Sequence, residues 1–236
     1  MGKYDVAVIG SGPAGAVAAY YLAEAGARVA IIEKERLPRY KTCGGGVVSR
    51  VLKLLPFDIS DVIERQFNTI EFHYDPERIF KVEKPYPIVS MVMRDHFDHL
   101  LVEQAVRKGA VLLQDHPVKD LTRQNGSCSI QTAHGAIKAG AVIAADGMLS
   151  PTARFLDIPD DRFLIPALEY EVWVPDADFE RLSGSVLFDL EGIQTGYAWN
   201  FPKKDHLSIG VGTMQRGKLK LHDHVQQYMA KLGIEK

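Results

Sequence analysis

The chain has 236 residues, carries a formal net charge of −2, and is 46% hydrophobic and 25% charged. This length can bury one large core or two interleaved ones. The balanced charge excludes the basic excess that is typical of nucleic-acid-binding proteins, and no apolar run reaches membrane-spanning length. Two cysteines, Cys43 and Cys128, provide no disulfide framework. We therefore expect a cytoplasmic globular protein without a signal peptide, with peripheral contact with the inner face of a membrane left open.

The first 33 residues follow the order strand, glycine turn, helix, strand and acidic residue. Apolar strands are predicted over 4–9 and 28–32, with a helix over 16–25 between them. This order is required of a dinucleotide-binding unit, in which glycines allow a tight turn and close approach to a pyrophosphate. The amides at the start of the helix, where a proline fits the first turn, then hold the phosphates. The residues concerned are Gly10, Gly12, Pro13, Ala14 and Gly15.

Glu33 follows the second strand directly. In such a unit an acidic residue at this point accepts hydrogen bonds from both ribose hydroxyls, and its charge repels a 2′-phosphate. We therefore predict that the site binds FAD or NAD rather than NADP.

Beyond Glu33 a charged segment that begins with Lys34 leads into Cys43, Gly44, Gly45 and Gly46. Three consecutive glycines leave bare amides that a flat ring or a phosphate can approach closely. The alternative is a flexible loop.

The pattern Pro38-x-Tyr40-x-x-Cys43-Gly44-Gly45-Gly46 resembles a motif of the geranylgeranyl reductase family of flavoproteins. The resemblance implies the p-hydroxybenzoate hydroxylase-like fold. In this α/β fold a Rossmann-type FAD-binding domain, here 1–66 and 91–160, is interleaved with a mixed-sheet α+β substrate domain, here 67–90 and 161–236. It also places FAD near Ala14, Glu33, Lys34 and the Cys43–Gly46 loop.

The next segment alternates between predicted helices and strands. Residues 47–64 have helical spacing interrupted at Pro56, 69–74 and 79–83 form a hairpin, and a helix runs from about Met91 to Lys108. Arg94 resembles the family's arginine that reaches the FAD, and the alternative is a surface ion pair with Asp98. His96 and His99 lie three residues apart on this helix but lack a third ligand nearby, so we predict no metal site.

Strands are then predicted over 111–113, 117–122, 127–132 and 141–145, with a tight turn at Asn125-Gly126. By resemblance, the backbone of Val118 lies against the adenine end of FAD. Asp146-Gly147, which ends the last strand, resembles the Asp-Gly motif of two-domain flavoproteins. Its presence after the glycine turn argues for FAD over NAD.

Strands over 168–174, 185–189 and 196–202 and a helix over 218–236 are predicted in the last third. Alternation places Tyr197, Trp199 and Phe201 on one face of a strand. A sheet core without a ligand would explain the aromatic residues alone. However, the longer pattern resembles a second signature of the same reductase family, which implies substrate-binding roles for the set Tyr197, Trp199, Phe201, Pro202, Gly210 and Gly212.

Two signatures resemble the geranylgeranyl reductase family, and this resemblance implies an FAD-dependent reductase that saturates carbon–carbon double bonds of a polyprenyl chain. This polyprenyl group is carried by a diphosphate, a chlorophyll precursor, an ether lipid or a quinone. We expect the flavin ring between the Cys43–Gly46 loop and the aromatic strand, facing an apolar channel, with Cys43 as the catalytic candidate. Aromatic faces there would stabilise positive charge that develops on the alkene. The electron donor is NAD(P)H or a ferredoxin, and the oligomeric state stays open.

Two alternatives remain. An aromatic monooxygenase on the same fold would share the glycine turn and the Asp-Gly motif. A non-catalytic flavin- or lipid-binding fragment is the other, because the family's later Gly-Asp element is not found and the chain reads as a partial protein.

Overall fold

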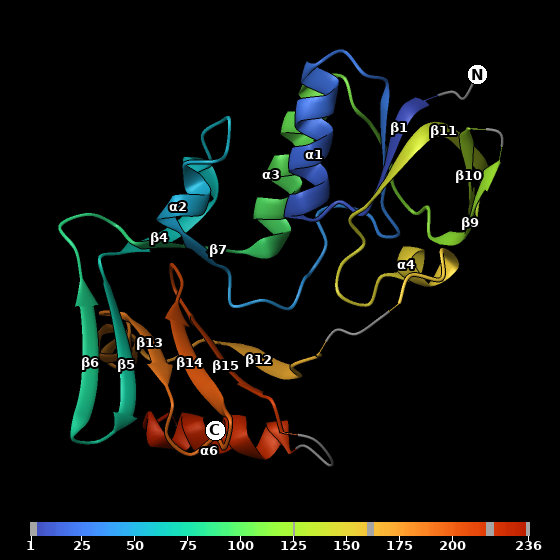
Figure 1. Cartoon of the computed structure of the whole chain (residues 1–236). Coiled ribbons are helices and arrows are strands. Elements are labelled where there is room, and N and C mark those ends of the chain that lie inside the picture. Colours follow the sequence, from blue (N-terminus) through green and yellow to red (C-terminus); the bar gives the residue numbers. More distant parts are fainter. Residues whose placement is uncertain (1–3, 125, 160–162, 216–219, 235–236) are drawn as a thin grey trace. The chain divides into compact units, whose positions relative to one another are not determined.

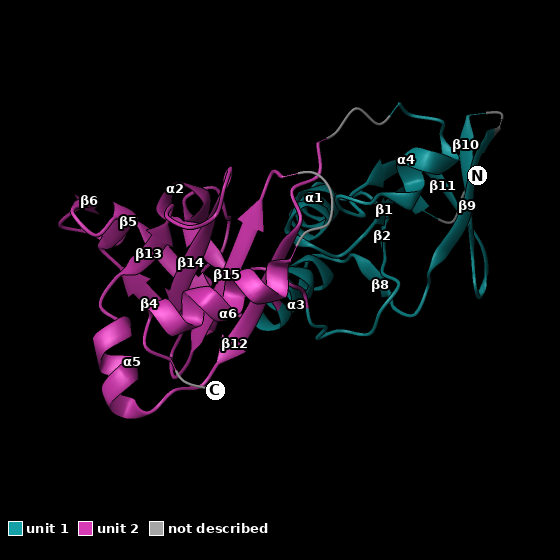
Figure 2. Ribbon diagram, turned by 90° about the horizontal axis from the view of Figure 1, so that it is seen from below, with its two compact units in different colours: residues 1–40, 95–161 teal, residues 41–94, 162–236 magenta. Residues whose placement is uncertain are grey.

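The computed structural model describes residues 4–124, 126–159, 163–215 and 220–234. The chain divides into two compact units (Figure 2): unit 1 contains residues 1–40 and 95–161, and unit 2 contains residues 41–94 and 162–236. Each unit is therefore built from two separate stretches of sequence, and the predicted interleaved α/β class is confirmed. Residues 41–66, which the sequence analysis assigned to the FAD-binding domain, cluster with unit 2.

Unit 1 contains a six-stranded sheet in the order β8-β2-β1-β11-β10-β9. The first four strands of this order are parallel, and β10 and β9 continue as an antiparallel meander. The strands are β1 (Tyr4–Ile9), β2 (Val29–Ile32), β8 (Val111–Leu113), β9 (Val118–Gln124), β10 (Ser127–Thr132) and β11 (Gly135–Ala144). All four residues of β2 are buried, as expected for a parallel strand covered on both faces.

Three helices accompany this sheet: α1 (Pro13–Glu24), α3 (Arg94–Arg107) and α4 (Pro151–Phe155). α1 packs on β1 and β2, and α3 lies beside α1 (Figure 1). The ammonium of Lys108 lies 2.7 Å from the carboxylate of Glu24, which joins the ends of these two helices.

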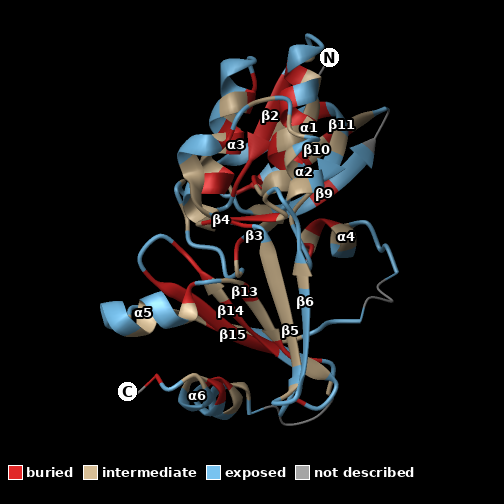
Figure 3. Cartoon of the chain, turned by 90° about the vertical axis from the view of Figure 1, so that its left-hand side faces the viewer, coloured by how far each residue is buried: buried red, intermediate tan, exposed pale blue. Residues whose placement is uncertain are grey.

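Unit 2 contains a second six-stranded sheet in the order β12-β15-β14-β13-β5-β6. Its strands are β5 (Thr69–Asp75), β6 (Arg78–Glu83), β12 (Ala167–Val172), β13 (Val186–Asp189), β14 (Gly196–Pro202) and β15 (Leu207–Thr213). The pairing is antiparallel except between β13 and β5. Every residue of β15 is buried (Figure 3), because its neighbours cover both edges and α6 (Leu221–Lys231) packs on it.

A small antiparallel sheet, β3-β7-β4, completes unit 2. It consists of β3 (Gly46–Val48), β4 (Ile63–Phe67) and β7 (Val89–Val92), accompanied by helices α2 (Ser49–Leu52) and α5 (Asp176–Leu182) and a 3₁₀ turn at Ser60–Val62. Phe67, Val89 and Met91 share an apolar core with Val186 of the larger sheet.

One predicted element is wrong in this region, and a second begins later than predicted. Residues 47–64 form strand ends and the four-residue α2 rather than a packing helix, because 46–48 pair with β7. The apolar run at Met91 is the end of a fully buried strand, and the helix begins only at Arg94. Short apolar runs fit a buried strand as well as a helix, so periodicity alone does not separate them.

The other predicted elements are confirmed within the described residues. The hairpin of β9 and β10 is present, although Asn125 lies outside the described residues. The last predicted helix is α6, and Lys218 and Lys236, at its expected ends, also lie outside them.

Candidate functional site

The glycine turn of unit 1 follows β1 and leads into α1. Gly10 has φ of +101°, and a Cβ built on it would lie 2.3 Å from the carbonyl oxygen of Ala145. A Cβ on Gly15 would lie 2.0 Å from the carbonyl oxygen of Gly10. Both positions therefore require glycine, because β1, the turn and α1 pack backbone against backbone there.

Gly12 differs from its two neighbours. A Cβ on Gly12 would meet no heavy atom within 4 Å. Gly12 is also the N-cap of α1, where no side chain caps the helix, and Pro13 occupies the first turn. A helix start with bare amides and open space at the glycine is the arrangement that a phosphate group requires. The residues at this turn therefore fit the pyrophosphate of a dinucleotide.

Glu33 lies at the end of β2 and is buried. One of its oxygens accepts hydrogen bonds from the backbone N–H of Ser11 (3.0 Å) and from its hydroxyl (2.5 Å), and the other accepts from the N–H of Glu35 (3.1 Å). A carboxylate has about four acceptor positions. Three are therefore used within the protein, which leaves capacity for one ribose hydroxyl, where the sequence had suggested two.

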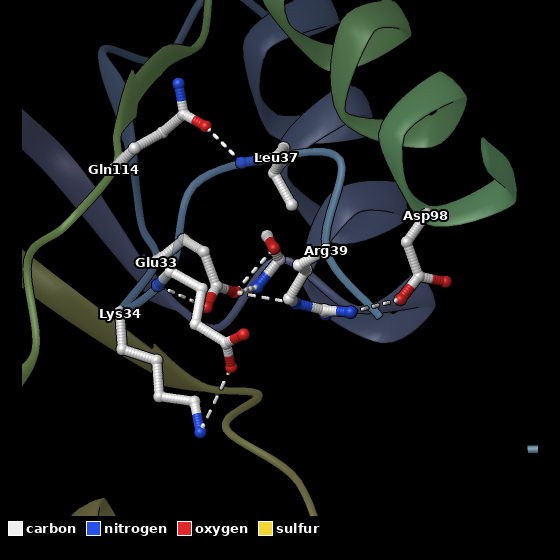
Figure 4. A network of polar contacts seen from close by, with 8 residues as sticks. Glu33, Lys34, Leu37, Arg39, Asp98 and Gln114 are labelled. Carbon is white, nitrogen blue, oxygen red and sulfur yellow. Dashed lines mark hydrogen bonds and ion pairs between the residues drawn. The ribbon is translucent and has the colours of Figure 1, made fainter. Parts of the chain in front are cut away.

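Arg39 connects Glu33 to α3 (Figure 4). Its guanidinium lies 3.8 Å from the Glu33 carboxylate and 3.1 Å from that of Asp98, and the three side chains are nearly buried. The loop that leads away from Glu33 is thus fixed to the helix. The side chain of Lys34 is exposed, and its ammonium lies 3.4 Å from the carboxylate of Glu35 (Figure 4).

Asp146 and Gly147 follow β11, and Asp146 lies beside the glycine turn. A Cβ on Gly10 would come within 3.0 Å of the Asp146 Cα. The Asp146 carboxylate accepts hydrogen bonds from the Ser150 hydroxyl (2.6 Å) and the Thr152 N–H (2.9 Å). Burial raises the pKa of Asp146, but these hydrogen bonds outweigh burial and hold it below its usual range. The Asp146 carboxylate thus stays ionised and holds the start of α4.

Val118 and Arg94, the other two residues expected to contact the cofactor, do not belong to the glycine turn or to the Asp146 segment. Val118 begins β9, which β11 and β10 separate from β1 in the sheet. Arg94 is the first residue of α3. Neither placement tests its predicted role. Among the described residues no three His, Cys, Asp or Glu side chains form a metal-binding group, and none of the described helices has the length and hydropathy to cross a membrane.

In unit 2 the Cys43–Gly46 loop lies directly against the aromatic strand β14. A Cβ on Gly44 would lie 2.7 Å from the ring of Phe201 and 3.2 Å from the indole nitrogen of Trp199. The segments that carry the two family signatures are therefore in direct contact. The contact is too close for a flavin ring to fit between Gly44 and these side chains, so that part of the expectation is not met. Cys43 itself is exposed.

The spacing of the second signature has a packing explanation. Trp199 pairs with Gly210 and Tyr197 with Gly212 across β14 and β15. A Cβ on Gly210 would lie 2.1 Å from the Trp199 ring. The glycines therefore make room for the indole, which is only 7% exposed, whereas Tyr197 is 40% exposed. Pro202 ends the strand and is buried.

Aromatic rings continue from β14 across the sheet. The Phe188 ring centroid lies 5.7 Å from that of Tyr197 and 5.2 Å from that of Phe72, and Phe72 lies 6.2 Å from Phe80. We call these four residues the aromatic row. The row ends at a surface pocket of about 620 Å³, formed by β5, β6 and the residue after β13.

Sequence reasoning missed two polar residues beside the loop, Glu169 and Lys203. The N–H of Cys43 donates to the Glu169 carboxylate (2.6 Å), and the Lys203 ammonium donates to the carbonyl of Gly44 (2.7 Å). Both side chains are buried. The sequence provides no clear signal for them, because a glutamate in an alternating strand and a lysine after a strand-ending proline are both typical of a solvated surface. Ser11 and Arg39 were missed for the same reason.

The sequence profile of the FAD binding domain family matches residues 3–180. The chain is 33% identical over 225 residues to digeranylgeranylglycerophospholipid reductase 1 of Methanopyrus kandleri, a match that covers 89% of this chain and 58% of that protein. It is 31% identical over 235 residues to the geranylgeranyl diphosphate reductase of Synechocystis, covering 92% of this chain and 57% of that protein.

Among solved structures, a geranylgeranyl bacteriochlorophyll reductase-like protein of Thermoplasma acidophilum superposes with a TM-score of 0.83 at 25% identity. The match covers 97% of this chain and 62% of that one. This chain thus spans about three fifths of the length of each of these proteins.

Proposed function

Because this chain belongs to the FAD binding domain family, we propose that it is the FAD-binding portion of a reductase that saturates carbon–carbon double bonds of a polyprenyl chain. One observation carries the proposal: Gly44 of the first signature packs on Trp199 and Phe201 of the second. The two reductases named above are 31% and 33% identical to this chain over 92% and 89% of its length. This similarity supports the substrate class.

Unit 1 supplies the residues that would hold FAD. The start of α1 at Gly12 would bind the pyrophosphate, and Glu33 a ribose hydroxyl. FAD, when bound and reduced, would supply the hydride for the alkene, and NAD(P)H or a ferredoxin would supply the electrons.

Unit 2 supplies the candidate substrate side. A polyprenyl chain has no polar handle along its length, so its position depends on close packing against apolar side chains. The aromatic row provides such a surface, and the exposed ring of Tyr197 is its end beside Trp199. An aromatic face contributes about 0.5–2 kcal/mol to the stabilisation of a cation in a desolvated site. We therefore assign contact with substrate to Tyr197 rather than to the covered Trp199.

Cys43 remains the catalytic candidate, because it is exposed on the loop that packs on Trp199 and Phe201, next to this row. The direct test incubates the protein with FAD, a reductant and a geranylgeranyl substrate, and measures product mass. Gain of hydrogen supports the proposal, whereas gain of oxygen would identify a monooxygenase and no flavin spectrum a non-catalytic fragment.

Two variants test the assigned residues. Cys43→Ala should keep the flavin spectrum but slow prenyl reduction, and unchanged turnover would remove Cys43 from the site. Tyr197→Ala should weaken binding of long prenyl chains more than short ones, because more of the long chain lies on the row. Tyr86→Ala, which removes an exposed tyrosine outside the row, is the matched control.

A further inference from the structure

Lys203 is the largest side chain in the described part of the protein that is fully buried. Lysine is almost never fully buried without partners, since removing an ammonium from water is costly. Its ammonium group donates to the carbonyl oxygens of Gly44 (2.7 Å) and Val92 (3.0 Å). Both acceptors belong to the Cys43–Gly46 loop or to β7, the strand that pairs with it.

Two glutamates of β12 balance this charge. Glu169 and Glu171 occupy alternate positions on the strand, so their side chains lie on the same face. Burial lowers the pKa of Lys203, while the negative charges of Glu171, Glu169 and Glu64 oppose that shift. Glu169 also accepts the hydrogen bond from the N–H of Cys43 at 2.6 Å.

The loop is thereby held at successive backbone groups. Glu169 binds the Cys43 N–H, Lys203 binds the Gly44 carbonyl, and the N–H of Val92 donates to the Gly45 carbonyl at 2.9 Å. Gly45 has φ of +69°, and a Cβ on it would lie 2.5 Å from the Lys203 nitrogen. The ammonium therefore occupies the space that glycine leaves, whereas Cys43 is exposed.

We propose that Lys203 and Glu169 are positioning residues that fix the main chain of the Cys43–Gly46 loop and so determine where the Cys43 thiol is presented. A cation holds a carbonyl of the loop and an anion holds the preceding amide. This inference rests on the proposed function for its catalytic consequence, but its structural part does not depend on any activity.

Hydrogen–deuterium exchange of the full chain with FAD tests the structural part. In Lys203→Met, amides of residues 43–46 should exchange about tenfold faster or more, whereas those of β15 should keep their wild-type rates. Lys204→Met is the matched control, because Lys204 is the exposed neighbour, and it should change neither segment. Wild-type exchange of the loop in a folded Lys203→Met protein would overturn the proposal.

Charge balance provides a second pair of variants. Lys203→Met removes the buried cation near Glu169, whereas Glu171 keeps its ion pair with His206. Because this loss of charge balance can unfold the protein, the second variant is Lys203→Met/Glu169→Gln, which removes one charge of each sign. The double variant should melt closer to wild type than Lys203→Met yet retain fast loop exchange. Lys203→Arg, which keeps charge and donors, should recover slow exchange at least in part. Loop protection that follows melting temperature across these variants would mean that Lys203 acts on overall stability alone, which would refute the proposal.

Kinetics separate this inference from the proposed function. If the chain reduces prenyl substrates, Lys203→Met should lower kcat about tenfold or more and change KM less than about twofold, because the substrate surface is intact. Equal effects on kcat and KM would contradict a positioning role. If the wild type shows no prenyl reduction, the exchange result still decides the loop question, while the proposed function fails by itself.

Discussion

Gly12→Ala should separate FAD binding from folding, and Gly15→Ala is its matched counterpart. Both substitutions add one methyl group within the same turn. A Cβ on Gly12 would meet nothing within 4 Å, and its φ of −68° is open to alanine, whereas a Cβ on Gly15 would lie 2.0 Å from the Gly10 carbonyl oxygen.

The magnitudes follow from these distances. At Gly12, alanine is a poorer N-cap than glycine but restricts the unfolded chain, so the two effects of about 0.5–1 kcal/mol nearly cancel. At Gly15 the backbone must move, which costs about 3 kcal/mol, or about 6–12 °C in Tm for a protein of this size. The Gly12 methyl group would stand where the pyrophosphate approaches. Loss of one charge-assisted hydrogen bond, about 1.5–3 kcal/mol, weakens FAD binding about tenfold to a hundredfold.

The assay is a thermal melt of each chain without FAD, followed by titration with FAD monitored by flavin fluorescence. Gly12→Ala should melt within a few degrees of wild type and bind FAD weakly, whereas Gly15→Ala should lose both stability and binding. Wild-type FAD affinity in a folded Gly12→Ala protein would refute the assignment of the pyrophosphate to this turn.

Two further predictions concern the stability of unit 2. Gly44→Ala should lower the free energy of unfolding in urea by about 1–3 kcal/mol because its Cβ would meet Phe201 at 2.7 Å, whereas Gly46→Ala, whose nearest contact would be 3.5 Å, should change it by less than about 0.5 kcal/mol; equal losses would contradict the packing argument. Burial lowers the pKa of His206, but its ion pairs with Glu171 and Asp205 outweigh burial and raise this pKa above 6.5. The ion pairs therefore add their full stability below pH 6.5, and this stability is lost as pH rises through the pKa of the folded state. Urea unfolding between about pH 6 and 9 should show this decline in wild type and a smaller one in Glu171→Gln, and identical profiles would exclude His206 as its source.

Features encoded within a short stretch of sequence were predictable. The strand, glycine turn and helix at the N-terminus follow from residues 4–25, because consecutive residues there encode each of them, although Gly10 also packs on Ala145, far along the chain. The alternation of Tyr197, Trp199 and Phe201 is also local, and their ring centroids lie about 6 Å apart as expected.

Features that depend on distant partners were not predictable. Lys203 is buried only because Gly44 and Val92, far away in the sequence, present carbonyl oxygens to it. Glu169 is likewise buried against a distant partner, the N–H of Cys43. The alternation of its strand would fit a solvated face equally well. The run at Met91 becomes a strand through its pairing with β3 and β4, which its own periodicity does not encode.

The contact between Gly10 and Ala145 has a consequence for synthesis of the protein. The glycine turn, although encoded at the very start, lacks the residue that packs on Gly10 until β11 and Ala145 have left the ribosome. By then residues 41–94, which belong to the other unit, have already emerged. Unit 1 therefore cannot complete its folding before a large part of unit 2 has been synthesised, and a ribosome stalled before that point would hold a chain with this turn only half built.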